Sequence, residues 1–292
     1  RMAKEALAAY GFEIDPETER IFTDLHKTHN QGVFDVYTAE IKSARHNKII
    51  TGLPDAYGRG RIVADFPRIA LYGIDRLIAA KKEDFKNYGD GEMTDDVIRV
   101  REEISDQIRA LKDMKTMAAE YGYDISYPAT TAKEAVQWLY FGYLAAIKQQ
   151  NGAAMSIGRI DSFIDIYVER DLERGILTEK EAQELVDQFT MKLRMVSFIR
   201  TPEYNSLFSG TPIWATLSLA GMGMDGRHHV TKTSYRFLNT LHNMGAAPEP
   251  NITVLWSANR PESFKEYAGR VSSMSSAIQY ETADVVRKPG GA

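Results

Sequence analysis

The chain has 292 residues, of which 43% are hydrophobic, and a formal net charge of −4 at pH 7, so it has enough length and apolar content for one large domain or two small ones. The charge excludes the basic excess expected of a protein that binds nucleic acid or an anionic membrane surface. The chain also lacks cysteine, an apolar run long enough to span a membrane and an N-terminal signal peptide, so we expect a cytoplasmic protein without a zinc–thiolate site.

The first strong helix signal begins after Thr94, whose side chain can cap a helix, and ends near Gly122. One mostly apolar stripe recurs at steps of three and four residues and comprises Val97, Arg101, Ile104, Ile108, Leu111 and Lys115. Before it, the polar stretch 86–91 predicts a loop between helices rather than a linker between domains.

Further helices are indicated by capping motifs. Thr131 and Glu134 predict a capping box for a helix through Gln149. That segment is apolar nearly all round, which is typical of a helix buried in a large fold. Gly175 ends the next predicted helix, and a box at 178–181 opens another that runs to about residue 199.

Strand signals are fewer. Residues 214–219, closed by Gly221, predict one short strand, and residues 252–256 predict a second, buried one. A helix-rich chain with short, widely separated strands indicates a helix-rich α/β fold, and nothing in the sequence divides it into separate domains.

The run from Thr51 to Arg61 predicts an ordered loop that carries two cations. Pro54 fixes its own backbone angle, and three nearby glycines allow tight turns and close approach to a ligand. Arg59 and Arg61 present planar guanidinium groups that suit a carboxylate or a phosphate. The plainer alternative is a surface loop with two solvated arginines.

This loop is one of several strings that resemble, in order and spacing, the pyruvate formate-lyase branch of the glycyl radical enzymes. The resemblance extends from about residue 10 to about residue 280. The other strings are residues 27–37, 70–75, 140–146, 150–156, 200–204, 212–216, 236–241 and 248–251.

The resemblance implies that residues 1–292 are a single fragment, the N-terminal and middle portion of the enzyme domain. The family fold is similar to a ten-stranded α/β barrel wrapped in helices. Its reaction converts pyruvate and coenzyme A reversibly to formate and acetyl-coenzyme A. The family's pair of adjacent cysteines and its radical glycine, which lies much further along the sequence, would both lie beyond Ala292. No catalytic residue is therefore expected in this chain. A radical S-adenosylmethionine activating enzyme would install the glycyl radical, and the full-length protein would be a homodimer.

Within that resemblance, Arg61 matches the arginine that holds the substrate carboxylate. Such a clamp would orient the neighbouring carbonyl group for attack. The alternative is a structural ion pair of Arg61 with Asp55 or Asp65, and Arg59 is expected to be a structural partner.

Other matched positions line the family's substrate cavity. They are Ala153, Ala154, Phe208 and Trp214. Small residues leave room for the substrate and aromatic walls exclude water. Core packing is the alternative for the aromatic residues, and the choice between the two alanines is open.

The resemblance also implies a coenzyme A surface, on which an aromatic ring stacks against the adenine. Its matched positions are Phe34, Gly52, Leu53 and Tyr57, with Arg45 and His46 as phosphate contacts. The family often has lysine at the position of His46. A solvated basic helix end is the alternative for this pair.

Two alternative functions stay open: a glycyl radical diol dehydratase, and a cysteine-free, non-catalytic partner module. The preference for pyruvate or 2-oxobutanoate is also open. We expect no metal site, because the histidine pairs 26/29 and 228/229 lack a suitably spaced third ligand. We expect no dinucleotide site, because Val63 stands where the fingerprint needs its third glycine.

Overall fold

The structure is a computed structural model. It describes residues 2–20, 24, 37–50, 63–88, 91, 93–150, 155–196, 213, 215–223 and 225–282.

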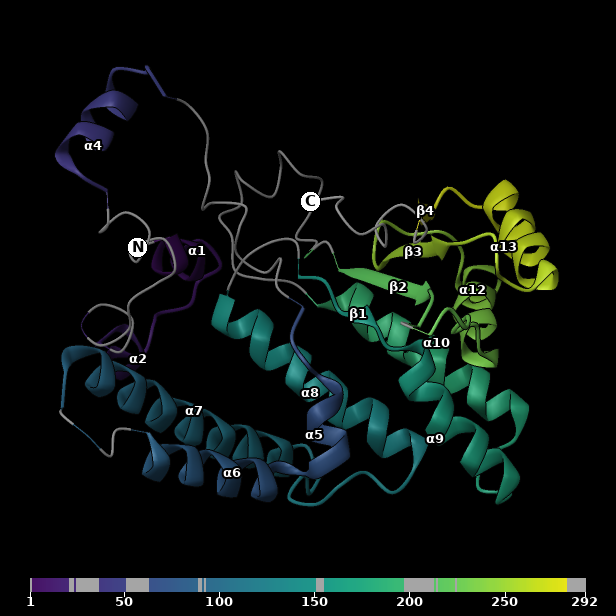
Figure 1. The fold of residues 1–292 in the computed structure, drawn as a ribbon, viewed down its shortest axis with the longest axis horizontal. Coiled ribbons are helices and arrows are strands. Elements are labelled where there is room, and N and C mark those ends of the chain that lie inside the picture. The colour runs from purple at the N-terminus through teal and green to yellow at the C-terminus, as the bar shows by residue number, and fades with distance from the viewer. Residues whose placement is uncertain are drawn as a thin grey trace.

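The described strands form one parallel sheet in the order β1-β2-β3-β4 (Figure 1). Their bounds are β1 Gly158–Arg159, β2 Thr216–Ala220, β3 Asn251–Trp256 and β4 Ile278–Thr282. In the register, Leu217 of β2 lies between Gly158 of β1 and Ile252 of β3. Leu217 and Ile252 are fully buried, as expected for central strands of a parallel sheet covered on both faces.

Helices connect these strands, because parallel neighbours need a crossover. They are α9 Asp161–Glu173 and α10 Glu179–Met195 between β1 and β2, α12 Lys232–Met244 before β3, and α13 Glu262–Met274 before β4. The predicted strands are confirmed, with β2 beginning at Thr216 and β3 at Asn251.

The remaining helices precede the first strand, β1, in the sequence. They are α1 Met2–Ala9, α2 Pro16–Arg20, α4 Ala39–His46, α5 Pro67–Tyr72, α6 Ile74–Asn87, α7 Asp95–Glu120 and α8 Ala132–Gln150. In Figure 1, α6 and α7 run side by side, and α8 lies between this pair and the sheet. The predicted loop at 86–91 begins two residues late, because α6 continues to Asn87.

The long capped helix is confirmed as α7. The Thr94 side chain accepts a hydrogen bond from the Val97 amide, and the helix ends at Glu120, just before Gly122 with its φ of +80°. The helix predicted to be buried is confirmed as α8, in which Trp138, Phe141 and Tyr143 are each at most 2% exposed.

The capping box predicted for α8 is correct in one half only. The Thr131 hydroxyl accepts from the Glu134 amide at 3.2 Å, as expected. The Glu134 carboxylate instead accepts from both the amide and the hydroxyl of Thr130, at 2.7 and 2.6 Å. Thr130 offers Glu134 two donors, so the bond that a capping box would make from the Glu134 carboxylate to Thr131 is made to Thr130 instead.

The box at Thr178 and Glu181 is present in full at the start of α10. The predicted end near residue 199 is wrong, because α10 stops at Met195. Val196 has extended backbone angles, φ −68° and ψ 132°, which are incompatible with a continuing helix.

A buried carboxylate joins α9 to β2 and α12. Asp161 is fully buried, and its Oδ2 accepts from the Ala220 amide at 2.7 Å and the Ser234 hydroxyl at 2.6 Å. Its Oδ1 accepts from the Ser162 amide at 2.9 Å. Burial raises the pKa of Asp161 to about 6, against the opposing effect of these donors.

We expect Asp161 to make the stability of the chain depend on pH. A carboxyl group whose pKa is raised by folding holds its proton more tightly in the folded chain, so its contribution is present below about pH 4 and lost as pH rises through about 6. Relative to Asp161→Asn, the free energy of unfolding should therefore fall by up to roughly 3 kcal/mol over that interval. Urea denaturation of both chains from pH 4 to 7 measures this, and a difference that does not change with pH contradicts it.

Candidate functional site

Most of the residues that the sequence assigns to the site lie outside the described residues. These are Phe34, Gly52, Leu53, Tyr57, Arg61, Ala153, Ala154, Phe208 and Trp214. Their neighbours in the chain are described, and these neighbours show how the segments that carry the predicted residues are arranged.

The described neighbours of the predicted substrate residues meet where the chain enters β1 and β2. Val63, two residues after Arg61, packs on Gly158, so closely that a Cβ atom on this glycine would lie 2.6 Å from Cγ1 of Val63. The amide of Met155, the residue after Ala154, donates to the carbonyl of Ile213 at 3.1 Å.

The same two segments continue into the sheet. The Ile157 amide donates to the Thr216 carbonyl at 2.9 Å, which leads directly into the pairing of β1 with β2. Met155, Ile213 and Ala215 are at most 2% exposed, so this backbone is packed in apolar surroundings. We call this region the entry junction; it comprises Val63, Met155, Ile157, Gly158, Ile213 and Ala215.

The structure places the two described candidates for coenzyme A elsewhere. Arg45 and His46 end the short helix α4, which stands away from the sheet in Figure 1. Nη1 of Arg45 donates to the Tyr37 hydroxyl at 3.1 Å, and its guanidinium group lies over the same ring. His46 is exposed. Arg45 thus has a local partner, and both cations occupy the helix C-terminus, where the helix dipole favours positive charge.

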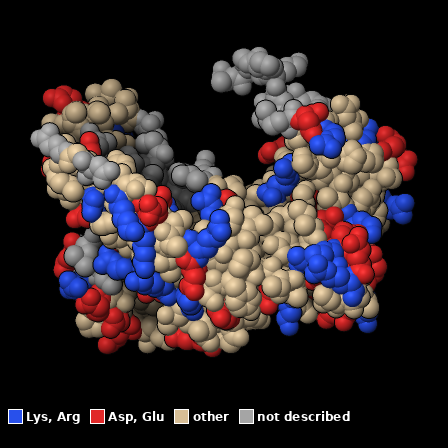
Figure 2. Space-filling view, turned by 60° about the horizontal axis from the view of Figure 1, so that its bottom comes forward, with Lys and Arg blue, Asp and Glu red and all other residues tan. Residues whose placement is uncertain are grey.

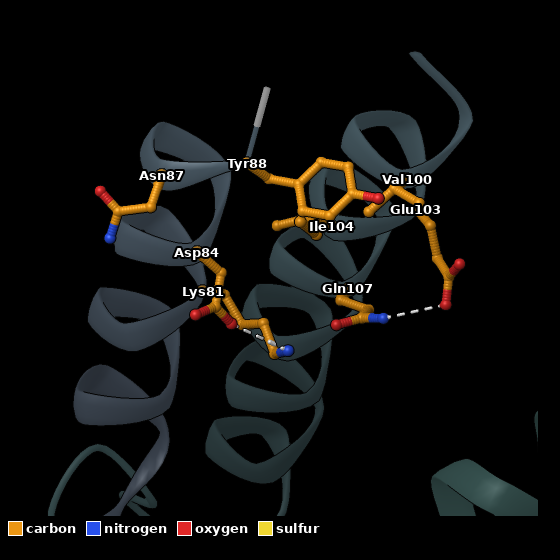
Figure 3. A pocket seen from close by; sticks show the side chains of 8 residues that line it. All are labelled: Lys81, Asp84, Asn87, Tyr88, Val100, Glu103, Ile104 and Gln107. Atoms are coloured by element: carbon orange, nitrogen blue, oxygen red, sulfur yellow. Dashed lines mark hydrogen bonds and ion pairs between the residues drawn. The ribbon is translucent and has the colours of Figure 1, made fainter. Parts of the chain in front are cut away.

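A hollow of about 430 Å³ lies between α6 and α7, on a different part of the molecule (Figure 3). Two pairs of its polar side chains are joined, one along each helix. Lys81 contacts Asp84 at 3.2 Å on α6, and Gln107 donates to Glu103 at 3.2 Å on α7. None of the predicted site residues lines it.

The His228–His229 pair belongs to a turn. Nδ1 of His228 accepts from the Val230 amide at 3.3 Å, and the ring of His229 packs beside Gly223. Burial, and then the charge of Arg159, lower the pKa of His229. Among the residues that the structure describes, no three histidine or acidic side chains are grouped so as to hold a metal ion.

The surface does not gather one sign of charge on the face shown in Figure 2, where lysine and arginine side chains intermingle with aspartate and glutamate. None of the described helices is both long enough and apolar enough to cross a lipid bilayer.

The chain is similar to known proteins over nearly its whole length. The family described as "Pyruvate formate lyase-like" matches residues 1–290. A curated relative from Haemophilus influenzae, named formate acetyltransferase, is 58% identical over 291 residues, which are 98% of this chain and 38% of the relative. The chain therefore spans about two fifths of the length of that relative.

Solved structures share the fold at low sequence identity. The glycerol-bound B12-independent glycerol dehydratase from Clostridium butyricum matches with a TM-score of 0.71 and 21% identity, over 94% of this chain and 38% of that one. A glycyl radical enzyme from Archaeoglobus fulgidus matches with a TM-score of 0.62 and 16% identity, over 90% and 38%. The helix-rich arrangement with a parallel sheet is thus similar to the fold of these enzymes.

Proposed function

The chain belongs to the pyruvate formate lyase-like family, and we propose that it is a single portion of a formate acetyltransferase. The observation that carries this proposal is the 58% identity, over 291 residues, to the protein of that name. The whole enzyme would convert pyruvate and coenzyme A reversibly to formate and acetyl-coenzyme A in the cytoplasm. It would act as a homodimer, and the described sheet would be part of a ten-stranded barrel that the rest of the enzyme completes.

The chemistry would be divided between this portion and the rest of the enzyme. These residues contain no cysteine, so the cysteine pair and the glycine would come from elsewhere in the protein. The glycyl radical, installed by a radical S-adenosylmethionine activating enzyme, would supply the unpaired electron. This portion would bind and orient the substrate and exclude water from it.

Arg61 would hold the carboxylate of pyruvate, with Ala153 or Ala154, Phe208 and Trp214 as the walls. The entry junction supports the assignment of Arg61, the alanines and Trp214, because Val63 packs on Gly158 and Met155 is hydrogen-bonded to Ile213 where the three segments enter the sheet. Successive Cα atoms are about 3.8 Å apart. Residues one or two positions from these contacts can therefore reach a common cavity.

Coenzyme A would bind on a surface formed by Phe34, Gly52, Leu53 and Tyr57, with adenine against an aromatic ring. Arg45 and His46 would contact its phosphates from the end of α4. The alternative for this pair, a basic helix end with a local role, is supported by the bond from Arg45 to Tyr37.

A diol dehydratase is the alternative enzyme. Dehydratases are among the similar structures, but at 21% identity or less that likeness concerns the fold alone. The far higher identity to an acetyltransferase favours acyl transfer. A non-catalytic partner module is the remaining alternative.

A chimeric enzyme tests the proposal. Residues 1–290 replace the matching portion of the Haemophilus influenzae protein, and the chimera is activated without oxygen. We expect acetyl-coenzyme A from pyruvate and coenzyme A, and no propionaldehyde from 1,2-propanediol. The 292-residue chain alone, treated in the same way, should form no acetyl-coenzyme A.

A folded chimera that carries the glycyl radical but forms no acetyl-coenzyme A would contradict the proposal, as would acetyl-coenzyme A formation by the chain alone.

A further inference from the structure

Two buried polar side chains hold the backbone of the entry junction, and neither belongs to the substrate or coenzyme A positions assigned above. Tyr143, on α8, is fully buried and donates from its hydroxyl to the Met155 carbonyl at 2.5 Å. Its ring packs edge-on against Phe66, with centroids 5.4 Å apart. Tyr143 therefore contacts both the segment that follows Arg61 and the segment that follows Ala154.

Glu249 holds the other side of the junction. It is 5% exposed, and its Oε2 accepts from the Ala215 amide at 2.7 Å. The Asn251 amide donates to the Ala215 carbonyl, also at 2.7 Å. Both backbone polar groups of Ala215, the residue after Trp214, are thus bound by one short segment that ends in the first residue of β3.

That segment is itself fixed from α10. The guanidinium group of Arg194 donates to the carbonyls of Met244, Gly245 and Glu249, at 3.3, 2.8 and 3.2 Å. The backbone that carries the Glu249 side chain is therefore held by a helix that is packed in the core through Phe189 and Leu193.

The charge of Glu249 also acts on Tyr143. Burial, followed by the charge of Glu249, raises the pKa of Tyr143 above its usual range. The hydroxyl group therefore stays protonated at neutral pH and remains a donor to Met155.

We propose that Tyr143 and Glu249 are positioning residues for the substrate cavity: they fix the backbone at Met155 and Ala215 and thereby place the adjoining alanines and Trp214. The proposal rests on the proposed function of the chain. A buried carboxylate is costly to retain for packing alone, and this one accepts a hydrogen bond from the Ala215 amide, beside a position assigned above to the cavity. Displacing a positioning group by about 1 Å can cost on the order of 100-fold in rate.

The test uses variants of the active chimera, with rates expressed per glycyl radical measured by electron paramagnetic resonance. Glu249→Ala should lower kcat with pyruvate by roughly 10- to 100-fold and leave KM for coenzyme A unchanged. Glu249→Gln keeps an acceptor oxygen for the Ala215 amide, so its kcat should stay within about threefold of the parent. Tyr143→Phe, which loses only the bond to Met155, should lower kcat by about 10-fold.

Val271→Ala is the matched control. Val271 is 1% exposed on α13, so this change lowers the melting temperature without touching the junction, and kcat per radical should be unchanged.

Full kcat in Glu249→Ala and Tyr143→Phe, with melting temperatures lowered as in Val271→Ala, would overturn the positioning role. An equal loss of kcat in Glu249→Gln and Glu249→Ala would also overturn it. Activity of the parent chimera shows separately whether the proposed function holds.

Discussion

Replacing Arg61 by lysine in the active chimera should lower kcat/KM for pyruvate by roughly 30- to 1,000-fold, which corresponds to about 2–4 kcal/mol of transition-state binding. Lysine keeps the charge but loses the planar pair of donors that would fix the carboxylate and aim the carbonyl group. Steady-state kinetics with pyruvate varied at saturating coenzyme A measure this loss.

Arg59 provides the matched control two residues earlier in the same loop. Arg59→Lys should change kcat/KM by less than about threefold, because we expect this side chain to have a local structural role. Equal losses in the two variants would remove Arg61 from its assigned role and favour the interpretation of both arginines as structural.

Gly73→Ala should destabilise the chain more than other glycine substitutions, by about 3–5 kcal/mol. Gly73 joins α5 to α6 with φ 74° and ψ 157°, a conformation that is strained for alanine. A Cβ atom there would lie 2.5 Å from the carbonyl carbon of Tyr127. The facing backbone cannot yield easily, because the Ile74 amide is bonded to the carbonyl of Ile125 at 2.9 Å.

Gly245→Ala separates this clash from the backbone strain. Gly245 has almost the same angles, φ 76° and ψ 169°, at the end of α12, but no atom lies within 4 Å of the position of its added Cβ. Gly245→Ala should therefore lower the free energy of unfolding by only about 1–3 kcal/mol. Urea denaturation gives both values, and equal losses would show that α5 and the segment at Tyr127 are not packed as closely as described.

Local signals in the sequence predicted the elements whose ends are set by local bonds. Thr94 caps α7 and Thr178 caps α10 through hydrogen bonds to amides three residues away. β3 was predicted from a run of β-branched and apolar residues, and this run is buried in the sheet. The residues that form each cap lie within a few positions of each other, so a short stretch of sequence is enough to predict the cap.

Distant contacts decide the two strands that the sequence did not predict, β1 and β4. β1 is only two residues long and begins with Gly158, so it has no periodic signal, and it exists because it pairs with Leu217 and Ser218 of β2. β4 is mostly exposed and lacks the expected alternation. It is ordered by its pairing with β3.

The site shows the same division. The family resemblance named Arg61, Trp214 and the alanines, and the structure brings their described neighbours to the entry junction. Tyr143 and Glu249 lie within the matched strings 140–146 and 248–251, but the resemblance assigned no role to either. Their hydrogen bonds join residues 12 and 34 positions apart, and a tyrosine in a buried helix is ordinarily interpreted as core. Only the three-dimensional structure shows that each side chain is directed at the backbone next to a position that the resemblance assigns to the cavity.

A crystal structure of the chimera with pyruvate bound tests the central claim most directly, namely that this chain supplies the substrate cavity of a formate acetyltransferase. We expect the pyruvate carboxylate to lie about 2.7–2.9 Å from the guanidinium nitrogens of Arg61, with Ala153 or Ala154, Phe208 and Trp214 around it. Pyruvate bound without contact to Arg61, or away from the entry junction, would contradict the account.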